Sequence, residues 1–139
     1  MSYLLDTNVI SEVRKPHGNA HVHTWLRSVK GADLYLSVLV IGEIRQGIER
    51  LRRRDLSQAH VYDTWLAHLH QDYADRILPI TTEIAEEWGR LNVPDPVPVI
   101  DGLLAATANV HKLTLVTRNV SDHARTGVRL LNPFEEAST

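Results

Sequence analysis

Apolar residues follow two patterns along this chain. Short apolar runs bounded by polar or turn residues predict buried β-strands. These runs occupy residues 3–5, 34–37, 77–80, 113–116 and 128–131. Longer segments in which apolar residues recur every three or four positions predict amphipathic helices. These segments span about residues 9–13, 20–30, 38–54, 55–74, 82–91 and 100–111. The chain therefore alternates between predicted strands and predicted helices.

Capping residues and prolines refine this prediction. Asn8 and Asn19 are expected N-caps, because an asparagine side chain accepts hydrogen bonds from the N–H groups of a first helical turn. Pro79 limits the pairing of strand 77–80, because proline has no N–H. Strands that alternate with helices predict a parallel sheet with right-handed crossovers. We therefore expect an α/β fold, a single domain over residues 1–139 with about five parallel strands between helices in an α/β/α sandwich.

The composition excludes several classes of protein. The 139 residues include no cysteine, which excludes a disulfide framework, a cysteine zinc site and thiol catalysis. The N-terminal residues lack the pattern of a signal peptide, and the longest uncharged apolar run, 34–42, is far shorter than the roughly 20 residues of a membrane span. We therefore expect a cytoplasmic protein. The net charge of −2 argues against a partner bound through a general basic surface.

Four carboxylates stand in positions that a solvated surface does not explain. Asp6 and Asp122 each follow a predicted strand, Asp101 opens a helix among apolar residues, and Glu43 lies beside the apolar face of its helix. In open α/β sheets, ligand sites form outside the carboxyl ends of the strands. We therefore expect the four acids to converge at this edge of the sheet.

Helix capping is the competing interpretation for Asp6 and Asp101, since negative charge is favoured at helix N-termini. Capping does not account for Glu43, which is not at a helix start. Four neighbouring carboxylates would repel one another and raise one another's pKa. A hard cation offsets that repulsion, and all-oxygen ligation selects Mg²⁺ or Mn²⁺ over zinc or copper. The sequence therefore predicts a magnesium or manganese site.

Short polar residues accompany these acids. Thr7 and Asn8 follow the first acid directly, and Thr117 and Asn119 precede the last. Such side chains orient metal-binding carboxylates or hold a nearby water. Turn and cap chemistry is an equally good interpretation of all four.

Two arginines are candidates for contacts with a phosphate group. The planar guanidinium suits phosphate recognition. Arg118 lies beside the fourth acid, and its competing interpretation is a salt bridge to a site carboxylate. Arg45 belongs to an arginine-rich helix. The competing interpretation is that these arginines are solvated and stabilise the helix C-terminus through the helix dipole.

The acidic positions form a series of short motifs. They read LDTNVISE at 5–12, GEIRQG at 42–47, DGLLAATA at 101–108, LVTRNVSD at 115–122 and LNPF at 131–134. Their order and spacing resemble those of PIN-domain nucleases, and within that family the VapC-type toxins of bacterial toxin–antitoxin pairs, in the FitB-like branch. His123 departs from the family pattern, because phenylalanine is usual at this position.

The resemblance implies Mg²⁺-dependent cleavage of RNA, with Mn²⁺ as a substitute, by a metal-activated water. By motif, Asp6, Glu43, Asp101 and Asp122 carry over as the catalytic and metal-binding acids. Glu43 would align or deprotonate the attacking water, or bind a second ion. The resemblance also implies a homodimer that a cognate VapB-like antitoxin neutralises, in a larger hetero-oligomer.

Two other functions compete with the nuclease interpretation. One is a catalytically silent PIN-fold module that keeps the fold for binding the antitoxin. The other is a phosphohydrolase, because Leu4-Leu5-Asp6-Thr7 also resembles the start of haloacid-dehalogenase-like enzymes. Those enzymes require a second aspartate two residues on, where this chain has Asn8.

Overall fold

The computed structural model describes residues 1–135, and within them five parallel strands form one sheet in the order β3-β2-β1-β4-β5. The strands are β1 (Tyr3–Leu5), β2 (Leu34–Ser37), β3 (Ile77–Leu78), β4 (Thr114–Val116) and β5 (Leu130–Leu131). Strand β1 is central, and Leu5 is in register with Val116 of β4. The carboxyl ends of β1 and β4 are therefore adjacent.

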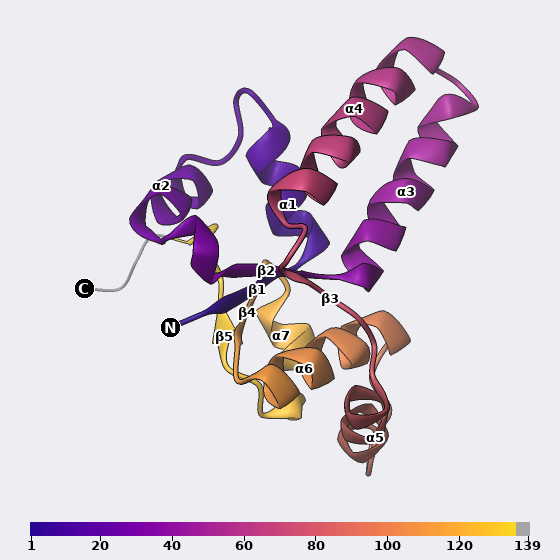
Figure 1. The fold of residues 1–139 in the computed structure, drawn as a ribbon. Coiled ribbons are helices and arrows are strands. Elements are labelled where there is room, and N and C mark those ends of the chain that lie inside the picture. The colour runs from indigo at the N-terminus through magenta and orange to yellow at the C-terminus, as the bar shows by residue number, and fades with distance from the viewer. Residues whose placement is uncertain (136–139) are drawn as a thin grey trace.

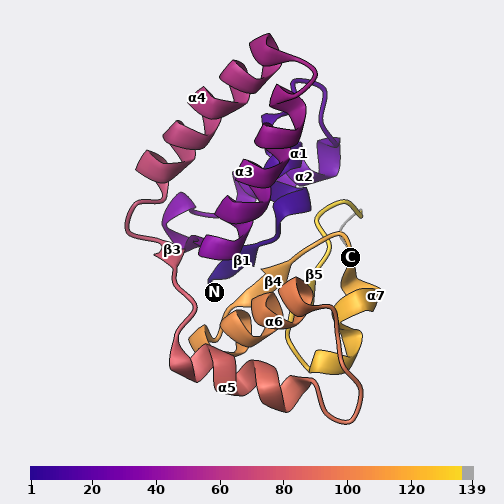
Figure 2. The same cartoon turned by 90° about the vertical axis from the view of Figure 1, so that its right-hand side faces the viewer.

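Helices cover both faces of this sheet. The helices before β3 are α1 (Thr7–Arg14), α2 (Ala20–Ser28), α3 (Val38–Arg52) and α4 (Leu56–Asp72). The later ones are α5 (Thr82–Leu91), α6 (Val99–His111) and α7 (Val120–His123). Figures 1 and 2 show α1–α4 on one side of the sheet and α5–α7 on the other. The predicted α/β fold with a parallel sheet is confirmed.

The core lies on both sides of the central strands. Leu4, Leu5, Leu36, Leu115 and Val116 are all 0% exposed. Consecutive strand residues point to opposite faces, so burial of both Leu4 and Leu5 requires a covered layer on each side. This explains why the strands read as continuous apolar runs in the sequence and do not alternate.

The structure corrects the expected ends of several elements. Asp6, and not Asn8, caps α1, because its Oδ1 accepts a hydrogen bond from the Thr7 N–H at 2.7 Å. The cap at Asn19 is confirmed by bonds from the N–H groups of His21 and Val22. Three strands are shorter than expected, namely β3, β4 and β5. Residues 136–139 of the expected domain 1–139 lie outside the described residues.

Pro79 and Gly127 account for two of these shorter strands. Strand β3 ends at Leu78, directly before Pro79, which has no N–H to donate to a neighbouring strand. Strand β5 begins two residues later than expected, because the Val128 N–H donates to Oγ1 of Thr126 at 3.4 Å across the turn in which Gly127 has a φ of 71°. No helix within residues 1–135 is long and apolar enough to cross a membrane.

Close packing of α5 against α6 depends on Gly102. A Cβ at this position would lie 2.7 Å from Cγ2 of Val97 and 3.0 Å from Cδ1 of Trp88. Val97 would have to move, because real Cβ atoms essentially never approach other heavy atoms within 3.0 Å, and Trp88 would have to shift by a few tenths of an ångström. Gly102 is also the neighbour of Asp101, so this packing determines where the start of α6 lies.

Replacing Gly102 with alanine is therefore expected to destabilise the protein by about 1–3 kcal/mol through overpacking. Urea unfolding of the two proteins measures the difference. The matched control is Gly89→Ala in α5, where an added Cβ meets nothing within 4 Å. This control is expected to be neutral or to gain up to about 1 kcal/mol from helix propensity. Equal stability of the two variants would contradict the packing argument.

Candidate active site

Asp6 lies at the junction of β1 and α1 and is firmly fixed there. Its side chain is buried, its Oδ1 accepts the Thr7 N–H, and its Oδ2 accepts the hydroxyl of Thr117 at 2.8 Å. Its own N–H donates to the carbonyl of Val116 at 2.9 Å. Capping and site interpretations are thus compatible, because one oxygen caps the helix while the other faces β4.

Thr117 connects the first and fourth acidic motifs. Its hydroxyl donates to Asp6 and accepts bonds from the Asn119 N–H at 3.0 Å and from Nδ2 of Asn8 at 3.5 Å. The Oδ1 of Asn8 in turn accepts the Arg118 N–H at 3.2 Å. The structure therefore joins three of the polar residues singled out in the sequence into one network around Asp6.

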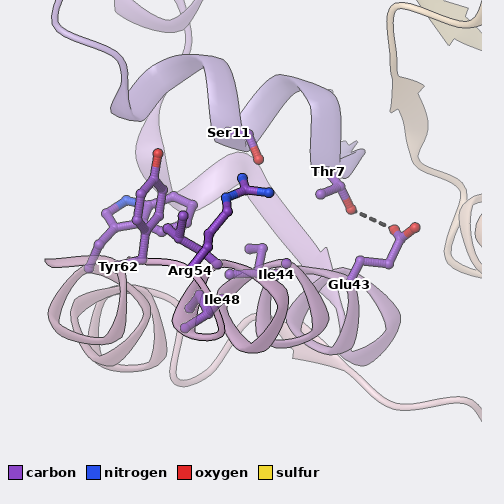
Figure 3. Close-up of a pocket in the computed structure, with 10 residues that line it drawn as sticks. Thr7, Ser11, Glu43, Ile44, Ile48, Arg54 and Tyr62 are labelled. Carbon is purple, nitrogen blue, oxygen red and sulfur yellow. Dashed lines mark hydrogen bonds between the residues drawn. The ribbon is translucent and has the colours of Figure 1, made fainter. Parts of the chain in front are cut away.

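Glu43 reaches this network from α3. Its Oε1 accepts the hydroxyl of Thr7 at 2.6 Å, as the dashed line in Figure 3 shows. Thr7 follows Asp6 in the chain, and its N–H is the one that Asp6 caps. Glu43 is therefore linked to Asp6 through Thr7, although Glu43 and Asp6 are far apart in sequence.

Asp101 and Asp122 come from α6 and α7. Asp101 is partly buried in the first turn of α6, and Asp122 is exposed. Burial raises the pKa of Asp101; His123 opposes this shift, and the charges of Asp6 and Asp122 add to it. The charges of Asp6 and Asp122 therefore both act on Asp101.

The donor chemistry of these residues fits a hard divalent cation. The side chains of Asp6, Asp101 and Asp122 offer carboxylate oxygens, the ligands that such a cation prefers. The negative charges of Asp6 and Asp122 disfavour the charged form of Asp101, and a bound cation would offset this repulsion. Among residues 1–135, no three histidine or acidic side chains stand in an arrangement that could hold one ion. The metal-binding roles of the four acids therefore stay predictions.

The two candidate arginines occupy different surroundings. The guanidinium of Arg118 lies 3.9 Å above the ring of Phe134 and forms no ion pair with the described residues. Arg45 pairs with Glu49 at 3.1 Å and with Asp63 at 2.8 Å. Arg118 is thus available to a ligand, whereas Arg45 is engaged in joining α3 to α4.

A groove beside Glu43 was not predicted from the sequence. It has a volume of about 390 Å³ and runs between α1, α3 and α4. Figure 3 shows Glu43 and Thr7 at one end and Tyr62 at the other, with the side chain of Arg54 extending into the space between. Ile44 lies along its floor. The apolar residues of α3 and α4 looked like ordinary core stripes, so no local signal distinguished a groove from closed packing.

His123 is a second feature that sequence reasoning left without a role. It is 0% exposed, and its Nε2 lies 3.9 Å from Oδ1 of Asp101. The available signal was its place next to Asp122.

Comparison with known proteins identifies the class to which this fold and site belong. The PIN domain model matches residues 3–127, and the chain belongs to the PIN-domain family. The resemblance inferred from the acidic motifs is confirmed, and the haloacid-dehalogenase alternative is set aside by this assignment.

Individual relatives narrow the branch of the family. Toxin FitB of Neisseria gonorrhoeae is 31% identical over 141 residues, which cover 96% of this chain and 99% of the relative. The VapC ribonuclease Y4jK of Sinorhizobium fredii is 30% identical over 142 residues, covering 96% and 99%. The crystal structure of FitAcB from Neisseria gonorrhoeae superposes with a TM-score of 0.89 at 32% identity, again over 96% of this chain and 99% of the other. The chain is thus similar to these proteins over nearly its full length.

Proposed function

We propose that this chain is a divalent-metal-dependent endoribonuclease that acts as the toxin of a VapBC-type toxin–antitoxin pair. The observation that carries the proposal is the hydrogen-bonded network at the carboxyl edge of the sheet, in which Thr117 binds Asp6 at 2.8 Å and Thr7, next to Asp6, binds Glu43 at 2.6 Å. Supporting it are the similarity to a protein named VapC ribonuclease and to one named toxin FitB. Because the substrate is RNA, we propose action in the cytoplasm.

The mechanism assigns separate tasks to the side chains. Asp6, Asp101 and Asp122 would hold Mg²⁺, with Mn²⁺ as a substitute. When bound, such an ion lowers the pKa of a water so that hydroxide is available to attack phosphorus. Thr117 keeps Asp6 oriented through its 2.8 Å hydrogen bond, so that little reorganisation is needed before reaction.

Glu43 would align or deprotonate the attacking water, or bind a second ion. Its Oε1 is fixed by Thr7 at 2.6 Å, and a carboxylate has a second oxygen that can accept a proton from water. Arg118 would contact the phosphate of the RNA, since its guanidinium is exposed and stacked on Phe134. Arg45 is a weaker candidate for that contact because two acids already bind it.

The partners follow from the same proposal. A cognate VapB-like antitoxin would bind the toxin and stop RNA cleavage, and the toxin itself would form a homodimer within a larger complex. Residues 1–139 would act as one functional unit. The reading frame that adjoins this gene is expected to encode the antitoxin.

Expression of the chain in a bacterial host tests this proposal. We expect growth to stop after induction, and to resume when the protein from the adjoining reading frame is co-expressed. RNA extracted after induction is expected to contain new internal cleavage ends. Normal growth and intact RNA in cells that accumulate the folded protein would contradict the toxin assignment.

A further inference from the structure

The imidazole of His123 is buried beside the proposed site without a hydrogen-bond partner. Its side chain is 0% exposed, and neither Nδ1 nor Nε2 has a partner among residues 1–135. Buried polar atoms without partners cost free energy, on the order of 1–3 kcal/mol each. A phenyl ring of similar outline would avoid this cost. A histidine in this place therefore calls for a role that its nitrogens perform.

The group that Nε2 faces is the carboxylate of Asp101, at 3.9 Å from Oδ1. This separation is about 1 Å longer than an N–H···O hydrogen bond. The histidine is fully enclosed at the end of α7, and its carbonyl accepts the hydroxyl of Thr126 at 2.6 Å, which fixes that end of the helix. The Asp101 side chain is 29% exposed and is thus the less enclosed of the two groups. The contact would therefore close by movement of Asp101.

We propose that His123 is a positioning residue that donates its Nε2–H to Oδ1 of Asp101 and so orients this carboxylate toward the divalent cation. The inference rests on the metal-dependent function proposed above and adds a residue to that site. A neutral imidazole suffices, because it carries one N–H donor. Hydrogen bonds from neighbouring residues to a metal ligand fix the orientation of that ligand, and their loss typically weakens metal affinity about 10- to 100-fold.

The electrostatics around Asp101 support this role. Asp101 is partly buried, and the negative charges of Asp6 and Asp122 act on it. A donor that favours the ionised carboxylate is needed where desolvation and like charges disfavour it. The Nε2 of His123 is placed to be that donor, at 3.9 Å from Oδ1 of Asp101 before the contact closes.

Three variants of the full-length protein test the inference. His123→Phe keeps the ring and removes both nitrogens. His123→Gln keeps an amide N–H that extends about as far as the imidazole Nε2, and His123→Asn keeps an amide that ends short of Asp101. Isothermal titration calorimetry with Mn²⁺ measures the affinity of each protein for the ion. Thermal melting in chelator measures the stability of each metal-free protein.

We expect wild type and His123→Gln to bind Mn²⁺ with similar affinity, and His123→Phe and His123→Asn to bind about 10-fold more weakly or worse. His123→Phe is expected to melt no lower than wild type. For the two weakened variants, the Mg²⁺ concentration that gives half-maximal RNA cleavage is expected to rise by the same factor, while the rate at saturating Mg²⁺ changes little.

Three results would overturn the inference. Wild-type Mn²⁺ affinity in His123→Phe or in His123→Asn would show that the donor is not used. Loss of affinity in His123→Gln as large as in His123→Asn would show that an N–H at this reach does not restore the contact. Electron paramagnetic resonance of bound Mn²⁺ could reveal a hyperfine coupling to nitrogen that is absent in His123→Phe. Such a coupling would show that the imidazole binds the ion directly and would overturn the positioning role. Failure of wild type to bind Mn²⁺ at all would instead overturn the proposed metal-dependent function, and the inference with it.

Discussion

Replacing Asp6 with asparagine is expected to lower the rate of Mg²⁺-dependent RNA cleavage by more than about 100-fold. Loss of a residue that only hydrogen-bonds to a metal ligand already lowers metal affinity or activity by about 10- to 100-fold. The Asp6→Asn variant removes the charge of a proposed ligand itself, so its effect should be larger. Asparagine is as good an N-cap as aspartate, so α1 keeps its first hydrogen bond from Thr7. Cleavage of a labelled RNA by the purified proteins measures the effect.

Asp55→Asn is the matched control for this substitution. Asp55 caps α4 by accepting the Gln58 N–H at 3.1 Å, and it takes no part in the proposed site. The same chemical change there is expected to leave cleavage at the wild-type rate. Equal cleavage by the Asp6→Asn protein and wild type would identify the activity as a contaminant and contradict the nuclease proposal.

Replacing Asp101 with asparagine is expected to abolish cleavage and at the same time to stabilise the metal-free protein at neutral pH. Burial raises the pKa of Asp101, so folding disfavours its charged form. The resulting penalty is full at pH values above the folded-state pKa, shrinks as the pH falls below that pKa, and is gone below the pKa that the carboxyl has in the unfolded chain. The variant lacks this charge and therefore lacks the penalty.

Thermal melts in chelator at several pH values check this prediction. The gain in Tm of Asp101→Asn over wild type is expected to be largest at pH 7 and to vanish in acid, where the wild-type carboxyl is protonated. Glu83→Gln is the matched control, since Glu83 is an exposed acid in the first turn of α5. A lower Tm for Asp101→Asn than for wild type at pH 7 would mean that the charge stabilises the metal-free fold, contrary to the account.

The fold was predictable because its strands are buried on both faces. Continuous runs such as Leu4-Leu5 mark central parallel strands, and the helical spacing in 38–54 marks the crossovers. The errors lie at the ends of helices and strands, where one or two hydrogen bonds determine which residue is the first or last of the element. Asn8 and Asp6 are both good caps, and the sequence does not reveal that the Asn8 side chain is taken up by Thr117 and the Arg118 N–H.

The acids of the site were predictable from their places after strands and at a helix start. Their connections were not, because the bond between Thr7 and Glu43 depends on how closely α3 approaches α1. The same is true of Arg45, whose pairing with Asp63 depends on how α4 folds back on α3. Contacts between distant segments are set by packing, which a single sequence does not encode locally.

Net charge was a poor guide to the proposed partner. The total of −2 argues against RNA binding when every acid is counted as surface that repels phosphate. Asp6 is buried, and Asp101 is partly so, and both would be neutralised by a cation under the proposed function. Arg118 of the fourth motif is exposed and forms no ion pair with an acid among the described residues. RNA affinity should therefore depend on the divalent ion as well as on salt.

Cleavage of one labelled RNA by the purified protein, first in chelator and then across a range of Mg²⁺ concentrations, tests the central claim most directly. The account predicts no cleavage in chelator, a rate that rises with Mg²⁺ to saturation, and recovery of the rate when Mn²⁺ replaces Mg²⁺. Cleavage in chelator at the rate seen in saturating Mg²⁺ would contradict it, because the four acids would then have no cation to hold.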